Sequence, residues 1–357
     1  MAIPSSLDQI DAAFLSDALG TSVTGVEAER IAVGEGFLGE LARLTLTYGS
    51  DATGPATVIA KIPTTDSGLK PIGLMLQAYE REARAYNEVI PQLEVRTAAA
   101  LYNGMDTETD DYCLLLEDIG HLSAGDHHAG ATLEQAQAAM VAAARMHARW
   151  WGNVDELEWV PPIDSPLNMG LQDMVADAFP VAVSEYGHLL GDDVIGGLEA
   201  FIPTMRDLLT AYGPMSRTLV HTDFRLDNMF FDDGELVLID WQVVSRGDGT
   251  SDVTPFLALN LSPELRREHE QDLLRLYFDT MSAAGAGYLE FDDLIERYRM
   301  TLNFWLAVYC YSAASKGETT QRGEELFQRV LARGADACRQ HRAWEKVGNY
   351  EPHDRIH

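Results

Sequence analysis

The sequence predicts an α+β protein of two lobes, a small lobe with an antiparallel β-sheet followed by a larger, mainly helical lobe. Runs with the period-two alternation of strands are concentrated in the first third of the 357 residues. From Ala131 onward helical patterns dominate, beginning with TLEQAQAAMVAAARMHARWWG, which has an N-cap at Thr132 and a stop at Gly152. We therefore expect an N-terminal lobe over residues 1–118 and a C-terminal lobe over residues 119–357, with a cleft as the natural ligand site.

The elements of the first lobe follow in a simple order. An amphipathic helix capped by Ser5 or Ser6 comes first and ends at Gly20. The runs VTGVEAERIAV, ELARLTLTY and ATVIAKIP then have strand character, because polar and apolar residues alternate and Thr and Tyr are enriched. The segment GLMLQAYEREARAYNEVI predicts one helix that stops near Pro91, and RTAAALY and DYCLLLEDI predict two more strands. Together these segments predict a five-stranded antiparallel sheet with one main helix.

Three glycines in VGEGFLGELARLTLTY have the spacing GxGxxG, namely Gly34, Gly36 and Gly39. In a dinucleotide-binding fold this spacing leads into a helix, whose N-terminus holds a pyrophosphate. In a kinase-type loop it leads into a strand, and the hairpin covers the phosphates of ATP. The alternation after Gly39 predicts a strand, which favours the ATP-covering loop over the dinucleotide fold.

Composition narrows the partners. The chain has 26 basic and 56 acidic residues, a formal charge of −30 that disfavours nucleic acid as a partner. The acidity has two interpretations, a soluble or salt-adapted surface and carboxylates that receive a cationic substrate. No apolar run approaches the ~18–20 residues that span a bilayer, so we expect no membrane partner. Three scattered cysteines and an N-terminal segment without a secretory pattern make the cytoplasm the expected compartment.

The strongest motif is LVHTDFRLDNMFFDDGELVLIDWQ. It contains Asp223, then Asn228 five positions later, then Asp240 at the end of an apolar strand. Phosphoryl transfer needs a carboxylate that accepts the proton of the attacking hydroxyl, and oxygen ligands that hold Mg²⁺ on the nucleotide. The pattern predicts Asp223 as the base and Asn228 and Asp240 as the metal ligands. Taken alone, the same residues also suit turns and a cap.

Lys61 is an isolated cation in the apolar run ATVIAKIP, where burial without an anion would be costly. The helix segment YEREARAY offers Glu82 as the partner, with Glu80 and Glu88 as alternatives. A paired Lys61 would point its ammonium toward the α- and β-phosphates of the nucleotide. The alternative is a lysine that extends to solvent at a sheet edge.

The segments GEGFLG, IAKIP, EREARAY, LLLEDI, HTDFRLDN and IDWQ together resemble the aminoglycoside phosphotransferase/choline kinase-like superfamily, near its ecdysteroid-kinase-like members. The resemblance covers nearly the whole chain and implies a protein-kinase-like fold with ATP and Mg²⁺ as cofactors. It assigns the same roles to the base, the metal ligands and the Lys61–Glu82 pair. It also implies that the hinge segment at Glu117, Asp118 and Ile119 meets adenine through its backbone, and that His221 braces the catalytic loop.

We therefore expect a small-molecule kinase that transfers the γ-phosphoryl group of ATP to a hydroxyl of an aminoglycoside, an amino alcohol, a sugar or a polycyclic alcohol. A peptide substrate is disfavoured, because no long activation segment follows Asp240. The alternative is a catalytically silent nucleotide-binding regulator or scaffold. It is motivated by Trp241 and Gln242 where protein kinases have Phe-Gly, and by Glu35 in the glycine loop. A third hypothesis is transfer of AMP to a protein.

Other residues have simpler interpretations. The histidines in HLSAGDHHAG, at positions 121, 127 and 128, are expected in a polar loop and not at a metal, and His147 is expected as a hydrogen-bonded core residue. A late series of aromatic residues is expected mainly in the core, with the alternative that some face the acceptor. The series is Tyr298, Phe304, Trp305, Tyr309 and Tyr311.

Overall fold

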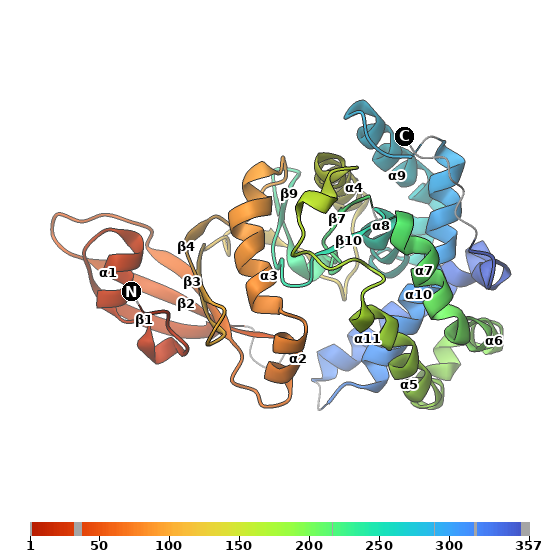
Figure 1. Ribbon diagram of the computed structural model, residues 1–357, viewed down its shortest axis with the longest axis horizontal. Helices are drawn as coiled ribbons and strands as arrows, with labels where there is room; N and C mark the ends of the chain where they lie inside the picture. The colour runs from red at the N-terminus through yellow and green to blue at the C-terminus, as the bar shows by residue number, and fades with distance from the viewer. Residues whose placement is uncertain (1, 32–37, 216, 289, 318–319, 351–357) are drawn as a thin grey trace. The chain divides into compact units, whose positions relative to one another are not determined.

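The computed structural model describes residues 2–31, 38–215, 217–288, 290–317 and 320–350 and divides the chain into two compact units (Figure 1). The first unit comprises Met1–Gln92, Arg96–Ser123 and Val237–Val243. The second comprises Leu93–Val95, Ala124–Leu236 and Val244–His357. Among the helices of the described residues, none is long and apolar enough to cross a membrane.

The first unit is built on the five-stranded antiparallel sheet that the sequence predicts. The strand order is β1-β2-β3-β5-β4. The strands are β1 (Val23–Ile31), β2 (Gly39–Tyr48), β3 (Thr57–Pro63), β4 (Ala100–Asp106) and β5 (Asp111–Glu117). Leu41 of β2 and Leu114 of β5 flank Lys61 of β3 in the pairing register. Lys61 therefore lies on the central strand, not at an edge.

One face of this sheet packs on α1 (Ala12–Leu19). Val58, Ala60 and Ile62 of β3 join Phe14 and Leu15 in this core. Side chains alternate along a strand, so Lys61 points to the opposite face. The helix begins later than predicted: a 3-10 turn, η1 (Leu7–Gln9), precedes it, and the cap is Asp11, which accepts a hydrogen bond from Phe14 N at 2.8 Å. It ends at Gly20 as predicted, where φ is +64° and a glycine is favoured.

The helical segment on the other face is broken, which the sequence did not predict. It consists of α2 (Leu69–Met75), α3 (Ala78–Arg84), the π-helical turn η2 (Ala85–Val89) and the 3-10 turn η3 (Ile90–Gln92) (Figure 1). Gln77 separates α2 from α3 with a left-handed φ of +52°. The apolar pattern continues through this kink, so periodicity alone does not reveal it. The side chain of Asn103 on β4 donates to Ala83 O at 2.7 Å and attaches α3 to the sheet.

The second unit is mainly helical. Its α-helices are α4 (Leu133–Trp150), α5 (Pro166–Leu190), α6 (Asp192–Phe201), α7 (Met205–Tyr212), α8 (Thr250–Pro255), α9 (Pro263–Ala283), α10 (Phe291–Ala314) and α11 (Gln321–His341). Its short turns are η4 (Val154–Glu156), η5 (Ile202–Thr204), η6 (Gly213–Met215), η7 (Leu226–Asn228), η8 (Phe256–Asn260) and η9 (Ala343–Lys346). Thr132 caps α4 in a capping box with Gln135, which confirms the predicted start of that helix.

A short antiparallel ribbon crosses the helices of this unit. It pairs β7 (Thr218–Val220) with β10 (Ser245–Gly247), and Leu219 lies opposite Arg246. The remaining strands are β6 (Ser123–Ala124), β8 (Met229–Asp232) and β9 (Glu235–Leu238). Because β7 ends at Val220, the HTDFRLDN segment begins directly where the ribbon stops.

Candidate functional site

In the first unit, the ammonium of Lys61 contacts two carboxylates from distant segments. Its Nζ lies 2.8 Å from a carboxylate oxygen of Glu82 on α3 and 2.9 Å from Oδ1 of Asp240. Lys61 is 5% exposed and Glu82 is 1% exposed. Burial lowers the pKa of Lys61, but Asp240 and then Glu82 outweigh it and raise the pKa above its ordinary value. Lys61 is therefore a buried and permanently charged cation.

Glu82, and not a neighbouring glutamate of the same helix, is the partner. Its other contact is the hydroxyl of Tyr112, which donates at 2.9 Å. Glu80 and Glu88 instead pair with Arg84 on the surface of the helix. Burial raises the pKa of Glu82, Lys61 opposes that shift, and the charge of Asp240 adds to it. The single ammonium is thus shared by two carboxylates.

The backbone around Asp240 fixes its direction. Asp240 has a φ of +68°, a left-handed conformation that costs a non-glycine residue about 1–3 kcal/mol. The next residue, Trp241, is fully buried and donates through Nε1 to Thr97 Oγ1 at 3.4 Å. Leu238 N donates to Arg96 O at 2.9 Å on the other side. These anchors hold the segment in the first unit and turn the carboxylate of Asp240 toward Lys61.

The glycine segment is described only at its end. Gly34 and Gly36, with Glu35, lie outside the described residues, whereas Gly39 is the first residue of β2. A Cβ on Gly39 would lie 3.1 Å from Ile62 O and 3.3 Å from Cε of Lys61. A strand follows the glycines, as predicted, and Gly39 is packed directly against the stem of Lys61.

The segment predicted as the hinge begins at the end of β5. Glu117 is the last residue of that strand, Ile119 is buried, and Asp118 pairs with Arg43 of β2 at 2.7 Å. Burial raises the pKa of Asp118, but the hydrogen bonds from Arg43 and Gly120 N outweigh it, so the pKa lies below its ordinary value. Glu117 and Asp118 also line a hollow of about 320 Å³ with residues of β3 and β4.

In the second unit, Asp223 and Asn228 are brought into contact by the η7 turn. Nδ2 of Asn228 donates to Oδ2 of Asp223 at 2.7 Å and to its carbonyl oxygen at 2.9 Å. Arg225 donates through Nε to the other oxygen, Oδ1, at 2.9 Å, and through Nη1 to Asp227 at 3.1 Å. Both oxygens of Asp223 are therefore oriented by donors from its own loop, and Arg225 is an additional residue of the site that sequence reasoning did not select.

A buried carboxylate supports this loop from behind. Asp252, fully buried in α8, accepts hydrogen bonds from the backbone N–H groups of His221 and Thr222, both at 2.7 Å. Thr222 has a left-handed φ of +71°, so these two bonds stabilise a strained backbone immediately before Asp223. Nε2 of His147 lies 3.1 Å from the same carboxylate, and its Nδ1 lies 2.8 Å from Tyr277 OH. This confirms His147 as a hydrogen-bonded core residue.

The histidine segment differs from the expected polar loop at one position. His127 is 1% exposed; its backbone N donates to Asp227 at 2.9 Å, and its ring lies against Leu259 O. Burial, with Arg225 and Arg333 nearby, lowers the pKa of His127 to about 3, so this histidine is neutral. Within the described ranges no cluster of His, Cys, Asp and Glu side chains is arranged to hold a metal.

The late aromatic residues pack mostly in the core, as expected. Tyr298, Phe304 and Trp305 are buried in α10. Tyr309 of the same helix is half-buried, and the charges of Arg225 and Asp223 both act on its hydroxyl. Burial raises the pKa of Tyr309, and Arg225 opposes the shift. Tyr309 is thus an aromatic side chain within electrostatic range of Asp223.

Known structures have the same fold. A Ralstonia eutropha protein that has been assigned as an aminoglycoside phosphotransferase superposes with a TM-score of 0.53 at 13% identity. The match covers 95% of this chain and 97% of that one. An APH(2″) enzyme in its GDP and kanamycin complex superposes with a TM-score of 0.52 at 14% identity, covering 93% of this chain and 97% of that one. A choline kinase of Cryptosporidium parvum superposes with a TM-score of 0.52 at 10% identity, covering 90% of this chain and 89% of that one. The fold is protein-kinase-like, with an antiparallel sheet in the N-terminal part and a mainly helical C-terminal part, as predicted.

The sequence model of the phosphotransferase enzyme family matches residues 55–288. This chain belongs to that family, and the resemblance to the aminoglycoside phosphotransferase/choline kinase-like superfamily is confirmed. A comparison with curated protein sequences found no match.

Proposed function

We propose that this protein is an ATP- and Mg²⁺-dependent kinase that phosphorylates a hydroxyl of a small molecule. The observation that carries the proposal is the contact of buried Lys61 with both Glu82 and Asp240. A structural ion pair needs one carboxylate, and the second one comes from a backbone in a strained, left-handed conformation. Such strain is concentrated at functional sites. The ammonium of Lys61 then binds the phosphates of the nucleotide, and the backbone of the hinge at Glu117, Asp118 and Ile119 contacts its base.

Asp223 is proposed as the base. It accepts the proton of the acceptor hydroxyl while the acceptor oxygen forms a bond to the γ-phosphorus and the bond to the β–γ bridging oxygen breaks, so ADP leaves. Asn228 and Arg225 orient the carboxylate for this step. Asp252 is a positioning residue, because it acts on Asp223 only through the backbone of His221 and Thr222.

The proposed metal ligands, Asn228 and Asp240, fit Mg²⁺ in their chemistry, because an amide oxygen and a carboxylate are the hard donors that this ion takes. The amide nitrogen of Asn228 faces Asp223, so the carbonyl oxygen is the atom of that side chain available to a cation. When bound, Mg²⁺ neutralises the charge of the β- and γ-phosphates. Gly34, Gly36 and Gly39 are proposed as the loop that covers these phosphates.

The acceptor is a small alcohol, and the four classes named from the sequence remain the candidates. The test is ADP release from MgATP across aminoglycosides, amino alcohols, sugars and polycyclic alcohols. We expect one class to stimulate ADP release, and Asp223→Asn to abolish the stimulation without loss of ATP binding. Stabilisation by MgATP without turnover on any alcohol would support the silent nucleotide-binding protein instead. Equal turnover by Asp223→Asn would contradict the assignment of the base.

A further inference from the structure

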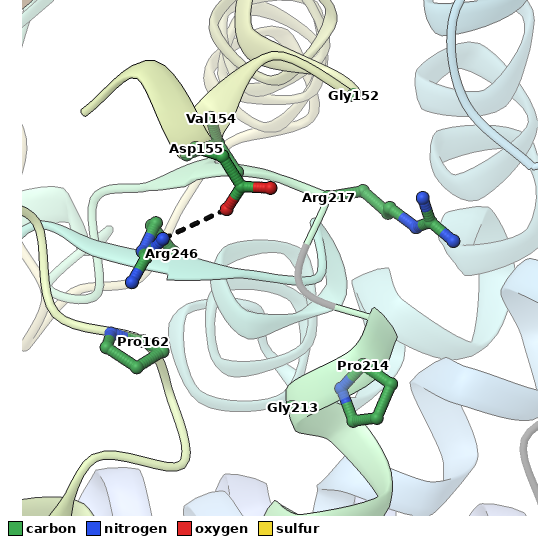
Figure 2. A pocket seen from close by; sticks show the side chains of 8 residues that line it. All are labelled: Gly152, Val154, Asp155, Pro162, Gly213, Pro214, Arg217 and Arg246. Carbon is green, nitrogen blue, oxygen red and sulfur yellow. Dashed lines mark hydrogen bonds and ion pairs between the residues drawn. The ribbon is translucent and has the colours of Figure 1, made fainter. Parts of the chain in front are cut away.

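A second cavity, lined by none of the residues of the candidate functional site, lies on the β7–β10 ribbon of the second unit (Figure 2). Its volume is about 310 Å³. The turn after α4, Pro162 and the η6 turn form its walls, and the basic residues of its lining are Arg217 and Arg246. Arg217 precedes β7 and Asp223 follows it, so the cavity and the base belong to opposite ends of that strand.

Arg246 is rigidly placed and incompletely paired. Its backbone N donates to Pro161 O, and its carbonyl accepts from Ile163 N, both at 2.9 Å. Its Nη1 donates to Asp155 at 2.9 Å, but the side chain of Asp155 is 92% exposed, and such surface pairs are weak. Its Nε is buried and has no hydrogen-bond partner in the described structure. A buried donor of a charged group without an acceptor is costly and points to an additional acceptor.

Arg217 supplies a second, available guanidinium. Its backbone is fixed by hydrogen bonds to Gly247 O at 3.0 Å and from Gly152 N at 2.7 Å. Its side chain is exposed and, within the part of the chain that the structure describes, makes no hydrogen bond or ion pair. Figure 2 shows it on the far side of the cavity from Arg246 and extended away from it. An exposed arginine exchanges rotamers within nanoseconds, so this side chain can turn toward a ligand.

The charge balance favours an anion. Among the residues that line the cavity, Arg217 and Arg246 are basic and Asp155 is acidic, in a chain whose formal charge is −30. The fork of an arginine matches a phosphate with two parallel hydrogen bonds. The volume lies at the lower end of that of ligand sites, which fits a small molecule and not a nucleotide.

We propose that this cavity binds a small phosphate-bearing anion between Arg246 and Arg217, and that Asp155 competes with the anion for Arg246. The site is independent of the proposed kinase chemistry, since none of its residues belongs to the catalytic loop or to the Lys61 cluster. Asp155 makes the proposal specific: its removal strengthens binding, whereas removal of a merely structural ion pair does not.

The test is isothermal titration of the full chain with inorganic phosphate, without nucleotide. We expect saturable binding by the wild type, and about tenfold weaker binding by Arg217→Gln and by Arg246→Gln, as for loss of a charge-assisted hydrogen bond. Asp155→Asn is expected to bind phosphate several-fold more tightly. The matched control is Arg145→Gln, which removes an exposed arginine of α4 outside the cavity and should leave binding unchanged.

Four results would overturn the proposal. They are no saturable binding of phosphate by the wild type, unchanged binding in both arginine variants, unchanged or weaker binding in Asp155→Asn, and equal weakening by Arg145→Gln. The last result would mean a general charge effect. Circular dichroism checks that each variant is folded. The result for Asp155→Asn remains informative even if an arginine variant fails to fold, because the Asp155 side chain is exposed and its replacement leaves the fold intact.

Discussion

Replacement of Lys61 by methionine tests whether the buried ammonium compensates the two carboxylates around it. The variant keeps a side chain of similar length but leaves Glu82 and Asp240 without the cation that lies 2.8 and 2.9 Å from them. Removal of one partner of a buried pair costs about 3–5 kcal/mol. This loss of stability has an upper limit, because Glu82 can take up a proton once the cation is gone. Protonation at pH 7 of a carboxyl group with an unfolded pKa of ~4.3 costs about 3.7 kcal/mol. We therefore expect the free energy of unfolding to fall by about 3–4 kcal/mol at pH 7.

This loss depends on pH in a definite direction. In Lys61→Met the folded protein holds a proton on Glu82 that the unfolded chain has lost, so its stability decreases as the pH rises. The difference in the free energy of unfolding between the wild type and Lys61→Met changes by up to about 1.4 kcal/mol per pH unit. This difference decreases from pH 8 toward pH 6. Urea unfolding followed by fluorescence measures this, with Trp241 as the tryptophan of the first unit.

Arg84→Met is the matched control, because it removes a cation from the same helix whose pairs with Glu80 and Glu88 are on the surface. It should cost less than about 1 kcal/mol and show no comparable pH dependence. A loss below about 1 kcal/mol in Lys61→Met, or a gap that is constant with pH, would refute the assignment of Lys61 as the compensating cation.

Three further predictions concern the second unit. Asp223→Asn should lower kcat by about 10²–10⁴ while the melting temperature changes little, and undiminished kcat in the ADP-release assay would contradict its role. Asp252→Asn turns an amide N–H₂ toward one of two backbone donors, so the free energy of unfolding in urea should fall by about 1–3 kcal/mol and activity should decrease. The control is Asp272→Asn, which changes an exposed residue of α9. Equal effects of the two variants would argue against a specific support of the loop by Asp252. His127, with its pKa lowered to about 3, remains neutral where the unfolded chain takes up a proton below pH ~6.5, so wild-type stability should fall by up to about 1.4 kcal/mol per unit on acidification. His127→Gln should lose that part of the slope, and an unchanged slope would contradict a buried neutral histidine.

The sequence was sufficient where the information was local. Alternation along β2 predicted a strand after Gly39, and the N-cap at Thr132 predicted the start of α4. The isolated charge of Lys61 in an apolar strand predicted a buried ion pair, and the structure shows one with Glu82. Each of these features depends on residues within one element or on a cost that burial imposes on a single group.

The features that sequence reasoning missed depend on distant contacts or on backbone angles. Asp240 belongs to the first unit because Trp241 and Leu238 attach to the strand-like segment at Arg96 and Thr97, far away in the chain. The kink at Gln77 leaves the apolar pattern intact. Asp252 stands in GDGTSDVT, where a carboxylate among small residues after the IDWQ motif was the available signal for a buried acceptor.

Arg225 shows a different limit. It stands inside the HTDFRLDN motif, yet its spacing to Asp223 does not reveal that its guanidinium lies between Asp223 and Asp227. Only the η7 turn, which folds the loop back on itself, brings these charges together. The family explains the motif, but the contact with each carboxylate oxygen has to be read from the structure.

The most direct test of the proposed function follows the two ends of the triphosphate separately. The wild type is incubated with an accepted alcohol and with ATP labelled either at the γ-phosphorus or at the α-phosphorus. The proposal predicts that only the γ label appears in the phosphorylated alcohol, and that Asp223→Asn removes it. Transfer of the α label, or no transfer of either label to any alcohol, would contradict the assignment of this protein as a small-molecule kinase.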